Sequence, residues 1–278
     1  MQIKIGIQKV LRKFGLYERI RASWLYDLYW TMTDRKVIDD RQRELEFYRR
    51  LLDGFREGDL IFDIGANHGY KTDIFLRLGA KVVAIEPDKS SQQVLEQKFR
   101  KLRLKTRPLV IVDKAVSDAN AVRTMWIDAP GSAKNTLSEK WADILRTDDR
   151  RFGNKLEFER SQQVETIPIE QLANAYGRPF FVKIDVEGHE LSVLGGMRQA
   201  VPYLSFEVNL PEFRAEGLEC VRALAGLAPT SEFNYTSDCR VGLALKRWQR
   251  AEQFLGVLLL CSDPSIEVFA RTVSYGEC

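Results

Sequence analysis

The sequence predicts an α/β protein whose core is a doubly wound, mostly parallel sheet. From residue 59 onward, short apolar runs alternate with longer segments of helical periodicity. A glycine-containing turn, GANHG at 65–69, directly follows the first apolar run, and acidic residues follow later runs. Such alternation gives a parallel sheet covered by helices on both faces, with ligands bound at the carboxyl ends of the strands.

The first elements after residue 59 have the clearest patterns. The run LIFDIGA at 60–66 predicts a buried strand, and YKTDIFLRLG at 70–79 predicts a helix that ends at Gly79. KVVAIEP at 81–87 predicts a second strand, and SSQQVLEQKFRKLRL at 90–104 predicts a helix with a serine cap. We therefore expect strand, turn, helix, strand and helix in succession.

Later elements continue the alternation after one polar interruption. Over the polar stretch 131–160 we expect a loop and a short helix at the rim of the site. The apolar patterns predict a strand at 108–118, a hairpin extending over 121–130, a strand running into a helix at 179–197, and strands at 203–209, near 241–248 and at 265–271.

Residues 1–55 form a predicted helical extension ahead of the main domain, which we place at 56–278. Apolar residues recur at helical spacing over 7–30 and again over 39–55. The first of these helices is basic and rich in aromatic residues, so it could lie on a membrane surface or cap a substrate cleft. Its charges are spread around the helix, which favours packing on the main domain.

Composition is that of a soluble globular protein. With 42 basic and 39 acidic residues the net charge is +3, which is too small to favour nucleic acid as a partner. Cys220, Cys239, Cys261 and Cys278 are widely spaced without a C-x-x-C pair, which argues against zinc and disulfides and suits a reducing cytoplasm. Basic residues interrupt the early apolar stretches, so we expect no leader, and the apolar run 256–261 is too short to cross a bilayer.

The turn GANHGYKT at 65–72 is typical of a nucleotide-binding loop, but it fits neither of the two commonest patterns. A phosphate-binding P-loop requires G-x-x-x-x-G-K-[ST], and Tyr70 stands where the second glycine must be. A dinucleotide fingerprint requires G-x-G-x-x-G, and Asn67 replaces its second glycine. Glu86 ends the next strand at the position expected for an acid that binds a ribose diol. A cofactor without phosphate, S-adenosylmethionine, is therefore favoured.

The sequence also resembles a known family. The segments FDIGANHGYKT, VVAIEPD, KIDVEGHELSVLGGM and LSFEVN, in this order, are similar to the FkbM family of S-adenosylmethionine-dependent methyltransferases. The resemblance covers about residues 59–210. It implies a class I, Rossmann-like methyltransferase fold with a seven-stranded sheet, and methylation of hydroxyl groups on sugars, polyketides and related metabolites.

The resemblance implies a set of cofactor-binding residues. The glycine turn would surround the methionine part of the cofactor, the acid after the second strand would bind the ribose hydroxyls, and the adenine would lie near 115–117. The implied residues are Asp63, Gly65, Asn67, Gly69, Glu86, Ala115 and Val116.

A second constellation, DVEGHE at 185–190, follows the fourth predicted strand. In extended chain Asp185 and Glu187 point to the same side, and Gly188 lets the chain turn so that His189 opens a helix. Methyl transfer from a sulfonium needs an acceptor oxygen aligned behind the methyl carbon, and an alcohol must begin to lose its proton. His189 is the predicted base because neutral imidazole accepts protons near pH 7, although helix capping is an alternative role.

The candidate catalytic residues are therefore His189, Asp185 and Glu187. Glu207 and Asn209, after the next strand, are the candidate substrate-binding residues. The carboxylates at 185, 187 and 207 could instead collect a divalent metal, but they equally suit hydrogen bonding to a polyol, so we expect no metal.

Together these observations predict a cytoplasmic O-methyltransferase that acts on a small acceptor, such as a glycan precursor or a natural product. The fourth strand lacks the Asn/Asp-Pro-Pro-aromatic turn of enzymes that methylate base nitrogens, which favours oxygen. One alternative is an NAD-dependent sugar-nucleotide enzyme, against which the missing glycine counts. Another is a non-catalytic binding protein docked to a membrane or complex by its N-terminal helix.

Overall fold

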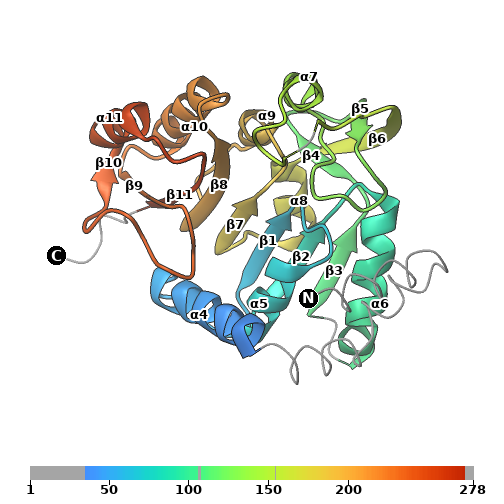
Figure 1. The fold of residues 1–278 in the computed structure, drawn as a ribbon. Helices are drawn as coiled ribbons and strands as arrows, with labels where there is room; N and C mark the ends of the chain where they lie inside the picture. The colour runs from blue at the N-terminus through green and yellow to red at the C-terminus, as the bar shows by residue number, and fades with distance from the viewer. Residues whose placement is uncertain (1–34, 106–107, 154, 273–278) are drawn as a thin grey trace.

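The computed structural model describes residues 35–105, 108–153 and 155–272. Its centre is an eight-stranded sheet in the order β10-β9-β11-β8-β7-β1-β2-β3 (Figure 1). Strands β3, β2, β1, β7 and β8 run parallel, whereas β11 runs antiparallel to β8 and β9. The strands are β1 Leu60–Ile64, β2 Lys81–Ile85, β3 Leu109–Val112, β7 Phe181–Ile184, β8 Tyr203–Asn209, β9 Ser231–Thr236, β10 Gln249–Arg250 and β11 Ser265–Thr272.

The predicted fold class, an α/β protein with a mostly parallel sheet, is confirmed. The expected count of seven strands is met only without β10, a two-residue edge strand that pairs with β9. Two residues are too few to show a strand periodicity in the sequence.

Helices cover both faces of the sheet, so each inner strand has two buried sides (Figure 1). In β1, Ile61 packs into one apolar core with α4 and α5, while Phe62 and Ile64 pack into the other core with α7 and α8. The helices are α4 Arg35–Leu51, α5 Tyr70–Arg77, α6 Lys89–Lys105, α7 Glu139–Thr147, α8 Ile169–Tyr176, α9 Glu190–Gly195, α10 Arg214–Leu227 and α11 Ala251–Leu260. Burial on both faces explains why these strands read as continuous apolar runs.

A second sheet of three strands corrects two predictions in the middle of the chain. The single strand predicted at 108–118 is two strands, because the chain leaves the main sheet after β3 and enters the small sheet at β4, Ala115–Ser117. The hairpin expected to extend over 121–130 is reduced to one antiparallel bridge between Trp126 and Thr136, because β5, Ala121–Ile127, pairs along its length with the distant β6, Arg160–Pro168. Long-range pairing of this kind leaves no local turn signal in the sequence.

The strand predicted near 241–248 is found only at the neighbouring β10, and residues 241–248 themselves form a loop that a side chain holds. The Asn234 amide donates to the carbonyl of Leu245 at 2.9 Å and accepts from its N–H at 3.0 Å. These contacts take up backbone groups that a strand would offer to a neighbour. The apolar run at 256–261 belongs largely to helix α11.

The predicted extension over 1–55 falls only partly within the described residues. The helix predicted at 39–55 corresponds to α4, whose Tyr48 is fully buried and packs edge-on against Phe75 of α5. The predicted helix over 7–30, with its possible membrane contact, lies outside the described residues. Within the described part of the chain, no helix has the length and apolar character needed to cross a membrane.

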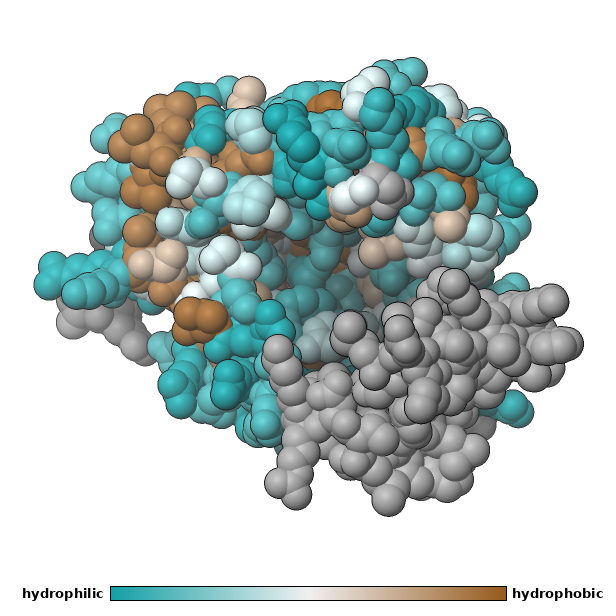
Figure 2. Space-filling view, in the orientation of Figure 1, coloured by the Kyte–Doolittle hydropathy of each residue, from teal (hydrophilic) through white to brown (hydrophobic). Residues whose placement is uncertain are grey.

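One face of the molecule shows both an apolar patch and a hollow. Apolar side chains gather over α11, where Leu259 and Leu260 are 55% and 87% exposed (Figure 2). Near the centre of the same view the surface is hollowed, and the residues within the hollow are mainly hydrophilic (Figure 2).

Candidate active site

The turn after β1 is fixed by close contact with the turn after β7. Gly65 has a φ of 81°, and a Cβ atom there would lie 1.7 Å from the carbonyl oxygen of Asp185. Only glycine fits at such a backbone contact. Asn67 follows with a φ of 45°, a left-handed conformation that asparagine tolerates better than most residues. The turn after β1 and the turn after β7 therefore pack directly against each other and line the same cavity.

Glu86 lies directly beside this turn at the end of β2. Its Oε2 accepts from the N–H of Asn67 at 2.7 Å, and its Oε1 accepts from the N–H of Asp88 at 2.8 Å. Burial raises the pKa of Glu86 to about 7, although both backbone donors act in the opposite direction. Each carboxylate oxygen keeps a second lone pair for a ligand hydroxyl.

The segment 128–136 is held against the turn after β1 by polar contacts. Asp88 Oδ2 accepts from the N–H of Gly131 at 2.8 Å and from the amide of Asn135 at 2.7 Å. The Asn67 amide donates to the Gly131 carbonyl at 3.2 Å. The polar stretch expected at the rim of the site therefore forms part of its wall.

A narrow cavity of about 120 Å³ lies at the carboxyl ends of β1, β2 and β7, and we call it the cofactor cavity. The structure brings most of the predicted residues together around it. The predicted residues that line it are Gly65, Asn67, Glu86, Ala115, Val116, Asp185, Glu187 and His189. The lining residues that sequence reasoning missed include Lys114, Met125, Ser132, Ala133, Asn135 and Leu137.

Two predicted cofactor residues lie behind the cavity wall. Asp63 is fully buried in β1, and its carboxylate accepts from the Thr72 hydroxyl at 2.5 Å. Gly69 begins α5 with a φ of 71°, and a Cβ atom there would lie 2.5 Å from Leu95 and 2.7 Å from Phe99 of α6. Both residues support the turn after β1, and neither lines the cofactor cavity.

The turn after β7 is held by residues from three other places. Glu187 has a φ of 54°, which is strained for a residue with a side chain. Its carboxylate accepts from the Trp141 indole N–H at 3.0 Å, and its carbonyl accepts from the Thr136 hydroxyl at 2.7 Å. Glu190, which is buried at the start of α9, accepts from the N–H groups of Val186 and Gly188 at 3.2 Å. These contacts fix the direction of the carboxylates in this turn.

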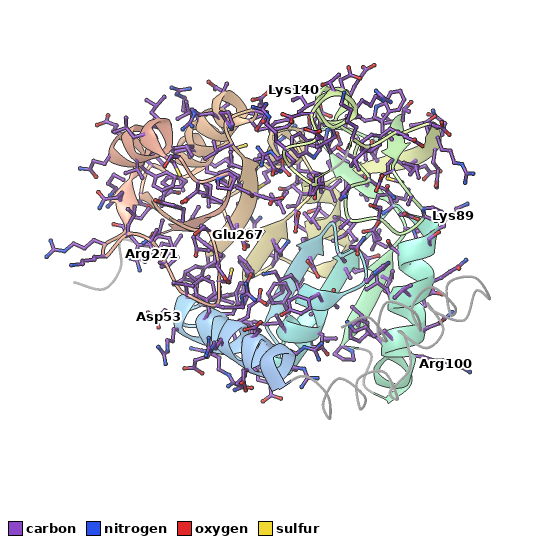
Figure 3. All side chains as sticks on the ribbon, viewed as in Figure 1. Asp53, Lys89, Arg100, Lys140, Glu267 and Arg271 are labelled. Carbon is purple, nitrogen blue, oxygen red and sulfur yellow. The ribbon has the colours of Figure 1, made fainter. Side chains whose placement is uncertain are left out.

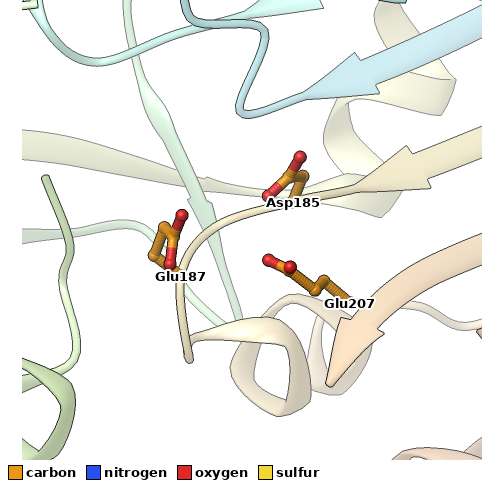
Figure 4. Close-up of side chains that lie close together, drawn as sticks. All are labelled: Asp185, Glu187 and Glu207. Carbon is orange, nitrogen blue, oxygen red and sulfur yellow. The ribbon is translucent and has the colours of Figure 1, made fainter. Parts of the chain in front are cut away.

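Asp185, Glu187 and Glu207 converge at the ends of β7 and β8 (Figure 4). One oxygen from each lies within 4.8 Å of the other two. Carboxylates at this spacing could hold a hard cation such as Mg²⁺. Protons bound by some of these carboxyl groups can reduce their mutual repulsion, as a cation would. The expectation of a site without metal therefore stays a prediction.

The three carboxyl groups differ in their affinity for protons. Burial, reinforced by the charge of Asp185, raises the pKa of Glu207 to about 8. Burial and the charge of Glu207 raise the pKa of Glu187 well above its ordinary value. Burial also opposes ionisation of Asp185, but the ammonium group of Lys183, 2.6 Å away, lowers its pKa overall. Asp185 is therefore the charged member of the group at neutral pH.

His189 lines the cofactor cavity, which Glu207 does not line. Its Nε2 is 3.0 Å from the Ser117 hydroxyl, at the end of β4. Burial lowers the pKa of His189 to about 4, and the charge of Arg123 acts in the same direction. The imidazole is thus neutral at pH 7, and it faces the strand end where the sequence placed the adenine.

A second cavity, of about 450 Å³, lies on the other side of Asp185, and we call it the acceptor cavity. It is lined from α4, the start of α5, the ends of β7 and β8, the segment 236–240 and β11. Asp185 is the one residue of the described chain that lines both cavities, and Glu207 lines the acceptor cavity beside it. Asn209, predicted to bind substrate, lines neither cavity.

Among the site residues that the sequence analysis did not name, Lys183 has the clearest signal in the sequence. It lies two residues before Asp185 in β7, so strand alternation places both side chains on one side. Trp141 and Thr136 carry no comparable signal, because each meets Glu187 across about 50 residues of intervening chain.

The mostly parallel sheet, in which β10 and β11 run antiparallel, the turn after β1 and the acid at the end of β2 are typical of the class of S-adenosylmethionine-dependent methyltransferases. Comparison with known proteins agrees with this class. The family described as "Methyltransferase FkbM domain" matches residues 63–223. That match covers more than half of the chain, so the chain belongs to the FkbM methyltransferase family. Because the chain belongs to a methyltransferase family, the alternative of an NAD-dependent sugar-nucleotide enzyme is not favoured.

Known proteins that are similar to the chain include a curated methyltransferase and a solved structure. "Hexuronic acid methyltransferase AglP" of Haloferax volcanii is 26% identical over 226 residues, which cover 78% of this chain and 78% of that protein. The crystal structure of methyltransferase FkbM from Methylobacillus flagellatus KT matches with a TM-score of 0.50 and 16% identity, and the match covers 80% of this chain. This chain spans 46% of that solved chain.

Proposed function

We propose that the protein transfers the methyl group of S-adenosylmethionine to a hydroxyl group of a small, sugar-containing acceptor. The observation that carries this proposal is the position of Asp185, which lines both cavities. A group placed between a cofactor and an acceptor can orient one toward the other. The name of the Haloferax relative supports an acceptor of the sugar class.

The residues of the cofactor cavity suit S-adenosylmethionine, which supplies a methyl group on a positively charged sulfur when bound. We assign Glu86 to the ribose diol, because its oxygens keep free lone pairs at the end of β2. We assign Gly65 and Asn67 to the methionine part, and Ala115 and Val116 to the adenine. Ala115 and Val116 have apolar, uncharged side chains, which suit contact with a flat aromatic base.

On the acceptor side, we assign the first role to Asp185. As a charged carboxylate it accepts a hydrogen bond from the acceptor hydroxyl and so directs an oxygen lone pair toward the cofactor cavity. Lys183, which is 3% exposed, holds Asp185 ionised and in place. Glu207, with a pKa of about 8, is the neighbouring group that takes up the released proton when it is ionised. Glu187, which accepts a hydrogen bond from Trp141, is the member of the carboxylate cluster that lines only the cofactor cavity.

His189 stays a predicted catalytic base, but its position favours a different role. It lines the cofactor cavity next to Ser117 and does not line the acceptor cavity. We therefore propose that it contacts the cofactor, and that Asp185 and Glu207 handle the acceptor proton.

We also propose the cytoplasm as the compartment. Three described cysteines, Cys220, Cys239 and Cys261, are buried free thiols, as a reducing compartment would keep them.

The first test is calorimetric titration of the purified protein with S-adenosylhomocysteine, with NAD and ATP as controls. We expect binding of S-adenosylhomocysteine in the micromolar range and none of the controls. Preference for NAD, or no binding of any of the three, would reject the cofactor assignment.

A further inference from the structure

The acceptor cavity is built largely from parts of the chain that the family match does not include. The match ends at residue 223, but Glu44 of α4, the segment 236–240 and Glu267 of β11 all line this cavity. Glu267, labelled at the centre of Figure 3, lies on β11 above α4. The selection of the acceptor therefore depends in large part on residues outside the matched family domain.

Acidic side chains outnumber basic ones around the cavity. Its acids are Glu44, Asp185, Glu207, Asp238 and Glu267. Its bases are Lys71, Lys183 and Arg240. Even with a proton on Glu207, four carboxylates face three cations.

Each of the three cations already has a carboxylate partner. Lys71 forms an ion pair with Glu44, and Glu267 lies 4.0 Å from the same ammonium group. Lys183 is 2.6 Å from Asp185. A carboxylate entering the cavity would find every positive group already paired with a carboxylate, so the loss of its hydration would be offset only in part.

Arg240 is the most fully paired of the three. Its guanidinium binds Asp238 through two nitrogens, at 2.8 and 2.7 Å, and binds Asp40 at 2.9 Å. The planar guanidinium is the side chain best suited to hold a carboxylate of an acidic sugar. Here three of its five N–H groups already bind carboxylates of the protein itself.

A neutral polyol meets the opposite situation. Its hydroxyl groups can donate to the carboxylates of Glu207 and Glu267, and can accept from Lys71. The hydroxyl of Ser265, which donates to Glu207 at 2.7 Å, adds a further polar group to the wall. No charge has to be buried when such a molecule enters.

We propose that the acceptor cavity selects an uncharged, hydroxyl-rich sugar and rejects the corresponding uronate. This inference rests on the proposed methyl transfer and deepens it by naming the acceptor class. It also separates this chain from the Haloferax relative, whose name specifies a hexuronic acid.

The test uses hexose pairs that differ only in a CH₂OH or a COO⁻ group: glucose with glucuronate, galactose with galacturonate, and mannose with mannuronate. Transfer of radiolabelled methyl groups is measured with the full-length protein, after S-adenosylhomocysteine binding has been established. We expect the neutral member of at least one pair to be turned over with a kcat/KM about tenfold or more above that of its uronate.

A variant and a matched control make the role of charge specific. Asp238→Asn removes one partner of Arg240, so we expect the discrimination against the uronate to fall about threefold or more. Asp148→Asn is the control, because Asp148 binds Arg150 in the same two-residue arrangement, at 2.9 Å, outside both cavities. The control should leave the ratio unchanged.

Two outcomes would overturn the proposal. Preference for the uronate in any pair would show that the cavity accepts a negative charge. Turnover of none of the six sugars would reject a hexose-sized polyol, whereas intact binding of S-adenosylhomocysteine would leave the methyltransferase assignment standing. Loss of that binding is a failure of the proposed function instead.

Discussion

The two cavities that meet at Asp185 are built in different ways. The cofactor cavity is shaped by turns after β1, β2 and β7, all within the residues that match the family. The acceptor cavity is shaped by side chains from α4, the segment 236–240 and β11, which lie far apart in the chain. Backbone geometry thus sets the first cavity and charge pairing sets the second. Substitutions should affect the two cavities differently.

The largest effect is expected from Gly65→Ala. The added Cβ would meet the Asp185 carbonyl at 1.7 Å, so both turns must shift. We expect a loss of more than about 3 kcal/mol in the free energy of unfolding and loss of S-adenosylhomocysteine binding. Gly54→Ala is the control, because Gly54 shares the φ of 81° but has no atom within 4 Å of its would-be Cβ. It should cost about 1 kcal/mol, and equal losses in the two variants would contradict the close contact.

Asp185→Asn should separate chemistry from cofactor binding. The neutral amide cannot serve as the charged acceptor of a hydrogen bond, so we expect kcat to fall about 10²-fold or more. Binding of S-adenosylhomocysteine should change less than about threefold. His189→Ala should behave in the opposite way, with weaker cofactor binding and a smaller change in kcat. A reversal of this pattern in steady-state kinetics and calorimetry would restore His189 as the base.

The pH dependence of kcat/KM should report Glu207. Below a pKa of about 8 this group holds a proton and cannot take another, so activity should rise as pH increases through 8. We expect about a tenfold increase from pH 7 to pH 9, and a flat, lower profile for Glu207→Gln. A rise centred near pH 4 that survives Glu207→Gln would instead indicate His189, whose pKa is about 4.

Glu44→Gln should affect the acceptor cavity alone. It removes the main charge partner of Lys71, so we expect a rise of about three- to tenfold in the KM of the sugar acceptor with unchanged S-adenosylhomocysteine affinity. Glu46→Gln, two residues further along α4 and outside both cavities, is the control. Equal effects of the two changes would show that α4 acts through stability only.

The smallest effect is expected from a chelator. If protons neutralise Glu187 and Glu207 and the ammonium group of Lys183 balances Asp185, dialysis against EDTA should change the rate less than about twofold, and added Mg²⁺ should do the same. Loss of activity that Mg²⁺ restores would show that a cation occupies this cluster of carboxylates.

Sequence reasoning found the parts of the molecule that depend on backbone. The structure brings the turn at Gly65, the acid Glu86 and the carboxylate Asp185 together at one cavity, because each lies at the end of a strand whose apolar pattern is visible in the sequence. Sequence reasoning failed where distant side chains decide the outcome. Asn234 turns the expected strand near 241–248 into a loop, and the pairing of Lys71 with Glu44 spans 27 residues. No local pattern encodes either contact.

Trp141 gives the protein a built-in optical reporter. The indole is fully buried, and its N–H is hydrogen-bonded to Glu187 at 3.0 Å, within the group of carboxylates between the two cavities. The emission of an indole responds to a charge placed this close to the ring. Titration of Glu187, or arrival of a positively charged sulfur near it, should therefore change the intrinsic fluorescence. Comparison with Trp141→Phe would assign the signal, so that ligand entry could be timed without a label.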